Sequence, residues 1–352
     1  MKIYAQYSKC KTLPQGSGDF INEAGLYTAM SQFANVFYSG QMFFPSGPNF
    51  GLKEYNGSIA SHVPQDCDLY YIRASLPALR AVPKGKPVLW VASPFEPEAY
   101  ARATIAAFTQ SWADRLQAGA NFPWFPKEHR KPYPNTVALR QVVGNAFQLR
   151  QGAPQTRKIR RQITCLGVET DHPFVIGHLG RIVKSNYPTA FLKLWPEMVK
   201  KNPDLRFLVG TTRGTLGKLP NSLERKFPHD QMPYVVSACD VMVVSDHGES
   251  WKISGSIKSI EASLCGVPTI LGRSPAREEL FGKHYPLFVP PIGTGYDDVA
   301  ELKRVLDLVI DDYEFRMSVG RYVQEVAQKH RVKASSVRFE RLFRKLIEEA
   351  KQ

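Results

Sequence analysis

The chain has 352 residues, more than the roughly 250 to 300 at which a single core stops growing, so we expect two domains. Its hydrophobic content of 43% and charged content of 22% exclude a disordered or collagen-like protein. The formal net charge of +14 predicts a surface that attracts polyanions such as nucleic acid, anionic lipid or phosphorylated substrates.

The sequence gives no sign of membrane insertion, secretion or a cysteine-based framework. No stretch approaches the roughly 18 to 20 uncharged apolar residues of a membrane span, and the N-terminus lacks a signal-peptide pattern. The five cysteines are scattered and form no CxxC pair, so neither a disulfide framework nor a structural zinc site is indicated. We therefore expect a cytoplasmic protein, either free or peripheral to the inner membrane.

The first part of the chain alternates between strands and helices. A strand is predicted over residues 1–8, and a loop rich in glycine and proline leads from it into an amphipathic helix over 22–33. Further strands are predicted at 69–72 and 87–92, followed by a helix over 99–116. This alternation is typical of a parallel α/β sheet.

The periodicity fades over residues 121–162, which are rich in aromatic residues, proline and basic residues, and we interpret them as surface loops and a helix. A second α/β unit begins near Phe174, and the tail from residue 316 is a long helical pattern, basic on its polar side. The expected domains are an acceptor-binding lobe over 1–170, a donor-binding lobe over 171–320, and a helical segment over 321–352 that packs back on the first lobe.

The most informative segment is SGSIKSIEASLCGVPTI, in which a small-residue loop leads into a helix and then a strand. Small residues at a helix N-terminus leave free amides and a positive dipole end facing a phosphate. These loop residues are Ser254, Gly255 and Ser256. One turn into the helix, Glu261 can accept hydrogen bonds from two ribose hydroxyls, and Lys258 adds charge near a diphosphate. The alternative is an ordinary i,i+3 surface pair.

This segment resembles the donor motif of retaining GT-B glycosyltransferases that use nucleotide sugars, in a variant with serine, lysine and glutamate spaced as S-x-x-x-K-x-x-E. The similarity extends upstream to MPYVVSACDVMVVSD and to GHLGRIVKSNYP, which looks like the first strand and loop of the donor lobe. The resemblance implies an α/β fold of the GT-B type, with two Rossmann-like lobes and the active site in the cleft between them. It also implies that Arg181 and Lys184 hold the diphosphate and stabilise it as it departs.

The chain departs from the family pattern beside the sugar. Many members carry a glutamate eight positions before Glu261, where this chain has Ile253, and Glu249 and Asp246 are the candidates to replace it. No acidic pair of the DxD type lies beside the phosphate loop, so no metal is implied. The expected substrate is a UDP- or GDP-sugar, and no cofactor is expected.

On the acceptor side the resemblance implies four residues. A glycine loop near the donor phosphates corresponds to GSG, where an ordinary turn is the alternative. VASPFEPE resembles the subgroup with an Asn-Ser-Pro turn, although this chain has Ala-Ser-Pro there, and in that subgroup YIRAS has an arginine counterpart. The implied residues are Gly16, Gly18, Arg73 and Ser93.

Three hypotheses about function stay open. The acceptor is an envelope glycan or lipid-linked intermediate, as for most of the family resembled, or a hydroxymethylated base in DNA, as in bacteriophage DNA glycosyltransferases. For DNA, the aromatic and basic residues of 122–133, together with the basic run 157–161, fit a phosphate-tracking surface with groups that stack on a flipped base. The third hypothesis is a binding module without catalysis.

Overall fold

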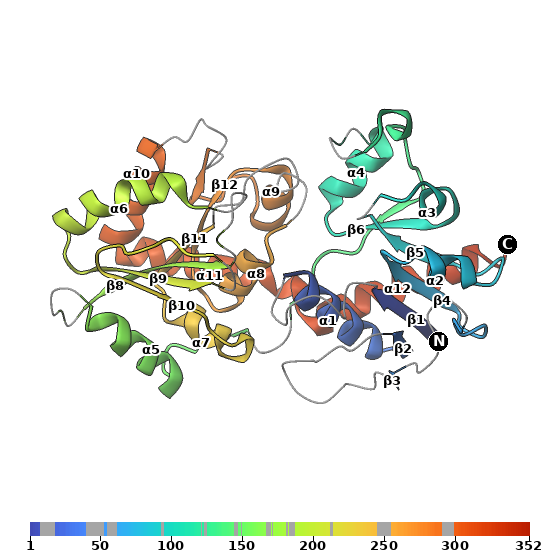
Figure 1. The fold of residues 1–352 in the computed structure, drawn as a ribbon, viewed down its shortest axis with the longest axis horizontal. Helices are drawn as coiled ribbons and strands as arrows, with labels where there is room; N and C mark the ends of the chain where they lie inside the picture. Colours follow the sequence, from blue (N-terminus) through green and yellow to red (C-terminus); the bar gives the residue numbers. More distant parts are fainter. Residues whose placement is uncertain are drawn as a thin grey trace. The chain divides into compact units, whose positions relative to one another are not determined.

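The fold is taken from a computed structural model. The structure describes residues 1–7, 18–39, 53–54, 62–92, 95–120, 122, 125–143, 147–148, 150–166, 170, 172–180, 182, 187–211, 214–244, 255–290 and 299–352. The chain divides into two compact units, the first formed by residues 1–145 and 329–352 and the second by residues 146–328 (Figure 1). Each unit holds a parallel sheet of its own.

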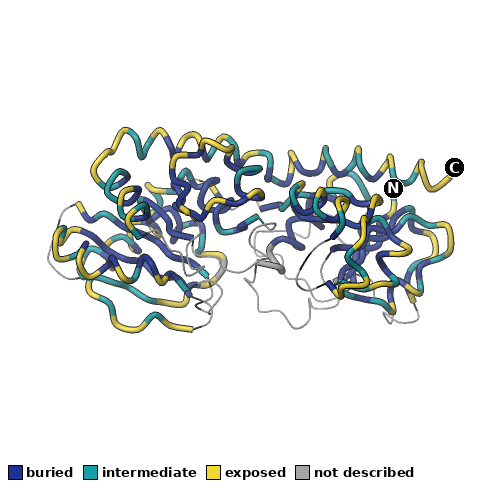
Figure 2. The backbone as a smooth tube through the Cα atoms, turned by 90° about the horizontal axis from the view of Figure 1, so that it is seen from above, coloured by how far each residue is buried: buried dark blue, intermediate teal, exposed yellow. Residues whose placement is uncertain are grey.

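The described part of the first unit contains a seven-stranded sheet in the order β3-β2-β1-β4-β5-β6-β7. The strands are β1 (Lys2–Tyr7), β2 (Asn35–Ser39), β3 (Lys53–Glu54), β4 (Leu69–Arg73), β5 (Val88–Val91), β6 (Thr104–Ala107) and β7 (Thr136–Ala138). Every residue of β4 and β5 is buried, as expected for a parallel sheet covered on both faces (Figure 2).

The helices of the first unit connect these strands, and one returns from the end of the chain. They are α1 (Gly18–Ser31), α2 (Leu76–Ala81), α3 (Pro97–Arg102), α4 (Gln110–Ala118) and α12 (Val332–Glu349). α12 packs against α1, and the rings of Phe33 and Phe343 meet edge to face with centroids 6.0 Å apart. The backbone amide of Val143 donates to the carbonyl of His330 at 2.9 Å. The C-terminal segment is therefore part of the first unit.

The second unit has six described strands in the order β10-β9-β8-β11-β12-β13. They are β8 (Phe174–Gly180), β9 (Leu205–Thr211), β10 (Ser222–Arg225), β11 (Val241–Val244), β12 (Thr269–Gly272) and β13 (Phe288–Val289). Its helices are α5 (Pro154–Thr164), α6 (Thr189–Lys201), α7 (Met232–Ser237), α8 (Ile257–Leu264), α9 (Pro275–Phe281), α10 (Val299–Asp311) and α11 (Tyr313–Ala327). α6 packs with α10 and α5 with α7, and Figure 1 shows these pairs above and below the sheet.

The strand order of the second sheet reverses between β8 and β11. The chain runs from β8 outward through β9 to β10, and then from β11 outward in the other direction through β12 to β13. Ligands of open parallel sheets bind outside the carboxyl ends of the strands at such a reversal. We therefore expect a ligand site at the carboxyl ends of β8 and β11 and at α8, which follows β11 in the chain.

The aromatic and basic segment differs from the sequence-based expectation in two ways. Phe122, Phe125 and Tyr133 are 0%, 1% and 7% exposed, so the prediction that they offer stacking groups on the surface is wrong. They pack with one another and with Tyr100, whose ring centroid lies 4.8 Å from that of Tyr133. Burial of large aromatic area outweighs the loop-like composition here.

The basic run lies on α5, and α5 belongs to the second unit rather than to the first. The buried side chains of Thr156, Ile159 and Ile163 face the sheet side, where α5 contacts α7 and β9. The helical spacing of these residues indicated the helix, but it could not indicate which sheet the helix covers. None of the helices within the described ranges combines the length and hydropathy that a membrane crossing needs.

A glycine in α11 sets how closely that helix approaches α8. A Cβ placed on Gly320 would lie 2.6 Å from the carbonyl oxygen of Gly266, the second residue after α8. Gly320→Ala should therefore lower the free energy of unfolding, because overpacking costs about 1–3 kcal/mol and alanine's helix propensity returns only about 1 kcal/mol. Urea unfolding measures the change.

Gly152→Ala is the matched control, because nothing lies within 4 Å of the added Cβ at that position. Equal stability of the two variants would show that α11 shifts without cost and that the close approach does not hold α8 in place.

Candidate functional site

The end of β8 meets the side chain of Lys258 from the first turn of α8. Gly180 ends β8 with φ of +125°, a conformation that residues with a side chain rarely adopt. A Cβ placed on Gly180 would lie 3.2 Å from both Cδ and Nζ of Lys258. The lysine side chain thus lies along the backbone at the carboxyl end of the sheet, at the reversal of strand order.

α8 presents its N-terminus to the same edge of the sheet. Ser256 is the N-cap residue, and its side chain makes no capping hydrogen bond. Its Oγ is buried and has no hydrogen-bond partner among the described residues. Gly255, which precedes it, is half-buried. The first amides of a helix have no acceptor within the helix, so this end combines N–H groups that point out of the helix, the positive dipole end and the Lys258 ammonium.

Glu261 lies one turn further along α8 and is 6% exposed. Within the described part of the chain, its Oε1 is buried without a hydrogen-bond partner. Burial raises the pKa of this carboxyl to about 8, although the nearby Lys258 charge acts in the opposite direction. A solvent-exposed i,i+3 pair does not describe this arrangement. A buried carboxylate oxygen that lacks a donor costs about 1–3 kcal/mol or more and is suited to receive a ligand hydroxyl.

Several residues expected at this site lie outside the described residues. They are Arg181, Lys184, Glu249 and Ser254 of the second unit and Gly16 and Ser93 of the first. Gly255, Ser256, Lys258 and Glu261 lie at and just after the N-terminus of α8, and the Lys258 side chain reaches Gly180 at the end of β8. Arg181 directly follows Gly180 in the chain.

His178 is a buried polar residue that the sequence interpretation did not single out. It lies in β8, is 1% exposed, and its Nδ1 is 3.1 Å from the carbonyl oxygen of Val243 in β11. This contact fastens the two strands at which the order of the sheet reverses. The sequence signal was a histidine within an otherwise apolar strand, FVIGHLG.

The carboxyl end of β4 in the first unit carries a buried ion pair. Arg73 Nη1 lies 2.7 Å from Oε1 of Glu23 on α1, and the Arg73 guanidinium stands 5.2 Å from the ring centroid of Phe108. Tyr71 donates its hydroxyl to the same Glu23 oxygen at 3.1 Å. Arg73, expected on the acceptor side, is thus held by an internal carboxylate. Glu23 was missed because its partner lies 50 positions away.

The strand order of the first sheet also reverses, between β1 and β4. There Gln6 donates from Nε2 to the Ser75 hydroxyl at 3.4 Å, and Gln6 accepts from the Tyr4 hydroxyl at 2.7 Å. Gly18 begins α1, which follows β1 in the chain. Across the described residues of both units, no group of three or more histidine, cysteine and acidic side chains could hold a metal ion.

Comparison with known proteins gives one curated relative and several solved structures. No protein-family model matches the chain. The chain is similar to a D-inositol 3-phosphate glycosyltransferase of Corynebacterium jeikeium strain K411, with 26% identity over 233 residues, which is 60% of this chain and 52% of the relative. The chain therefore spans about half the length of this curated relative.

The solved structures match over nearly the whole chain. The Anabaena protein HepE in complex with UDP and glucose has a TM-score of 0.68 at 14% identity, covering 98% of this chain and 99% of HepE. Sucrose-phosphate synthase from Thermosynechococcus elongatus has a TM-score of 0.64 at 14% identity, covering 99% of each chain. The chain has the GT-B fold. The expected α/β class with two Rossmann-like sheets is thereby confirmed.

The raised pKa of Glu261 predicts a pH-dependent stability. Between the unperturbed value of 4.5 and about 8, the folded protein holds a proton that the unfolded chain releases. The free energy of unfolding therefore falls as the pH rises through this window, by at most about 1.4 kcal/mol per pH unit. Glu261→Gln removes this dependence, so the variant should gain stability relative to the wild type between pH 5 and pH 8. Urea unfolding at both pH values measures the difference.

Glu325→Gln is the control, since this glutamate of α11 is exposed. A Glu261→Gln variant that keeps the wild-type pH dependence would contradict the assignment of a buried, donor-deprived carboxyl.

Proposed function

We propose that this GT-B chain is a hexosyltransferase that moves a sugar from a nucleoside-diphosphate sugar to an acceptor hydroxyl. The observation that carries the proposal is the buried Glu261 carboxylate, placed one turn behind a helix N-terminus at the strand-order reversal. The similarity to a D-inositol 3-phosphate glycosyltransferase supports a transferase, and the HepE complexes with UDP and with UDP-glucose support a UDP-sugar donor.

In this proposal the ribose and the diphosphate of the nucleotide are bound by different groups of the protein. The Glu261 carboxylate accepts hydrogen bonds from the ribose hydroxyls, which satisfies a buried oxygen that has no donor among the described residues. The diphosphate lies at the N-terminus of α8. There the backbone amides that follow Ser254, Gly255 and Ser256 in the chain, together with the Lys258 ammonium, balance the negative charge of the diphosphate. Gly180 leaves room at the end of β8 for the Lys258 side chain to reach this position.

Arg181 and Lys184 are proposed to act on the leaving group. They follow Gly180, the last residue of β8, by one and four positions in the chain. In the reaction the bond from the anomeric carbon to the diphosphate oxygen breaks and a bond to the acceptor oxygen forms on the same face. The acceptor hydroxyl gives its proton to the departing diphosphate oxygen. Fixed positive charges lower the barrier because negative charge grows on the diphosphate as that bond breaks.

For the acceptor we propose an envelope glycan or a lipid-linked intermediate. The DNA alternative rested on the basic excess and on aromatic residues that could stack on a flipped base, and it loses the second support because Phe122, Phe125 and Tyr133 are buried. On the acceptor side, Gly16 and Gly18 would allow close backbone approach and Ser93 would supply a hydroxyl. Arg73 would contribute from the position in which its ion pair with Glu23 holds it. Glu249 is proposed to contact the donor sugar in place of Ile253.

Removing the Glu261 carboxylate should abolish tight donor binding. Glu261→Ala loses two ribose hydrogen bonds worth about 1.5–3 kcal/mol each, so the Kd for UDP should rise about 100-fold or more. Isothermal titration calorimetry with UDP measures it, with the exposed Glu325→Gln as control. An unchanged Kd in a folded Glu261→Ala variant would remove the carboxylate from the donor site.

Arg181→Gln combined with Lys184→Gln should reduce turnover more than donor binding. If their charges act on the developing diphosphate, kcat should fall about 100-fold, the typical loss for one electrostatic stabiliser, while the Kd for UDP-glucose changes much less. Donor hydrolysis and transfer to a panel of glycan acceptors give kcat, and calorimetry gives Kd. Equal losses would point to uniform binding. Wild-type protein that binds UDP-glucose and neither hydrolyses nor transfers it would be a binding module.

A further inference from the structure

A basic cavity of about 530 Å³ opens at the edge of the second sheet opposite the donor site. It lies where β8 enters the sheet at Phe174 and where Asp240 precedes β11. Six residues separate Phe174 from Gly180, so at about 3.3 Å per residue the two edges of β8 are roughly 20 Å apart. All residues that line the cavity belong to the second unit.

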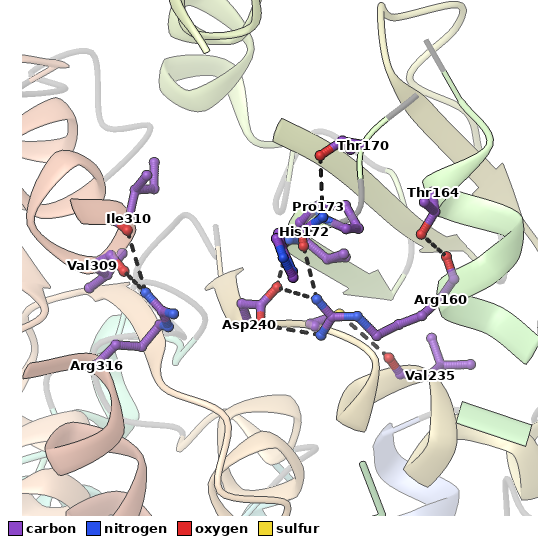
Figure 3. A network of polar contacts seen from close by, with 12 residues as sticks. Arg160, Thr164, Thr170, His172, Pro173, Val235, Asp240, Val309, Ile310 and Arg316 are labelled. Carbon is purple, nitrogen blue, oxygen red and sulfur yellow. Dashed lines mark hydrogen bonds and ion pairs between the residues drawn. The ribbon is translucent and has the colours of Figure 1, made fainter. Parts of the chain in front are cut away.

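Arg160, one of the residues that line the cavity, is held in place by an ion pair and hydrogen bonds. Arg160 reaches from α5 and pairs with both carboxylate oxygens of Asp240, at 3.2 and 3.0 Å, and it also donates to the Pro173 carbonyl at 2.9 Å (Figure 3). The Val175 amide donates to the same carboxylate at 2.7 Å. The single acidic side chain that lines the cavity is therefore already neutralised.

Three further arginines leave the cavity with excess positive charge. Arg157 and Arg161 are exposed and lie one turn apart on α5, where like charges repel by about 0.2–0.5 kcal/mol. Arg316 comes from α11 on the other side and donates to the Val309 carbonyl at 2.6 Å. Over the described ranges none of these three pairs with a carboxylate.

Two aromatic rings, those of Phe174 and Tyr313, lie beside the Arg316 guanidinium in the cavity. The Arg316 guanidinium lies 4.9 Å from the ring centroid of Phe174 and 5.3 Å from that of Tyr313, and these contacts fix its orientation. Tyr313 itself is 58% exposed. An exposed aromatic ring beside oriented guanidinium groups offers a face for the apolar part of a ligand whose anionic part the arginines hold.

We propose that this cavity is a second binding site, separate from the donor edge, for a small organic phosphate. Its volume lies in the range of roughly 300–1,000 Å³ that small-molecule sites occupy. Its arginines match the charge and fork geometry of a phosphate. A bilayer is a less suitable occupant, because the apolar side chains of α5, Ile159 and Ile163, are buried and leave α5 no apolar group to insert.

The proposal is tested with 1-naphthyl phosphate, which carries a phosphate and a flat apolar group, and with inorganic phosphate as the comparison. Calorimetry on the full chain should give one saturable site for 1-naphthyl phosphate and weaker binding of inorganic phosphate. Arg157→Gln with Arg161→Gln should raise the Kd at least about tenfold, the loss expected for one charge-assisted hydrogen bond. Tyr313→Ala should weaken the binding of 1-naphthyl phosphate by a larger factor than that of inorganic phosphate.

The matched control is Lys193→Gln with Lys200→Gln, which removes two exposed charges from α6 in the same unit and should leave binding unchanged. Glu261→Ala should also leave it unchanged, which separates this site from the donor site. Absence of saturable binding to the wild type, or an equal loss in the control, would overturn the proposal. So would a wild type that binds duplex DNA through Arg157 and Arg161 and does not bind 1-naphthyl phosphate.

Discussion

The second unit buries the Glu261 carboxyl group on α8, and one of its oxygens receives no hydrogen bond from the residues that the structure describes. Nearly every buried polar group in a folded protein has a hydrogen-bond partner, and Glu261 Oε1 has none among the described residues. This unfavourable burial occurs on α8, which follows the strand at the reversal of strand order, and about one turn after the helix N-terminus. The raised pKa of about 8 expresses the same cost in the free protein. A ligand hydroxyl at Oε1 would relieve it, so the site gains selectivity for a ligand that can donate there.

The constraints around α8 keep this carboxylate in position. The Gly320 backbone allows α11 to approach the turn after α8, and the Lys258 side chain lies along Gly180. His178 links β8 to β11 across the reversal. Each contact needs a residue of particular size or hydrogen-bonding capacity at a position far away in sequence. The site geometry is therefore a property of the whole unit rather than of the donor segment alone.

Local periodicity predicted some parts of this structure and missed others. The helix expected over 99–116 is wrong, because the strand β6 (Thr104–Ala107) lies between the short helix α3 and α4. Apolar runs such as 174–180 and the helix that carries Glu261 were recognisable, since a parallel strand buried on both faces gives a continuous apolar run. The partners of buried charges were not recognisable. Asp240 meets Arg160 from 80 positions away and Glu23 meets Arg73 from 50, and no spacing rule within one element reaches so far.

Net charge was the weakest guide, because arginine serves two physical roles in this chain. Arg206 and Arg277 are 0% and 1% exposed, and they donate to the carbonyls of Pro203 and Gly272 at 2.6 and 2.9 Å. Such buried guanidinium groups satisfy backbone acceptors inside the fold, so they contribute less to a surface that attracts polyanions than the formal charge of +14 suggests. The charge that is available to a ligand is local. In the cavity beside Phe174 this available charge is that of Arg157, Arg161 and Arg316, since Asp240 neutralises Arg160. The shape of the cavity, rather than the total charge of the chain, limits what can bind there.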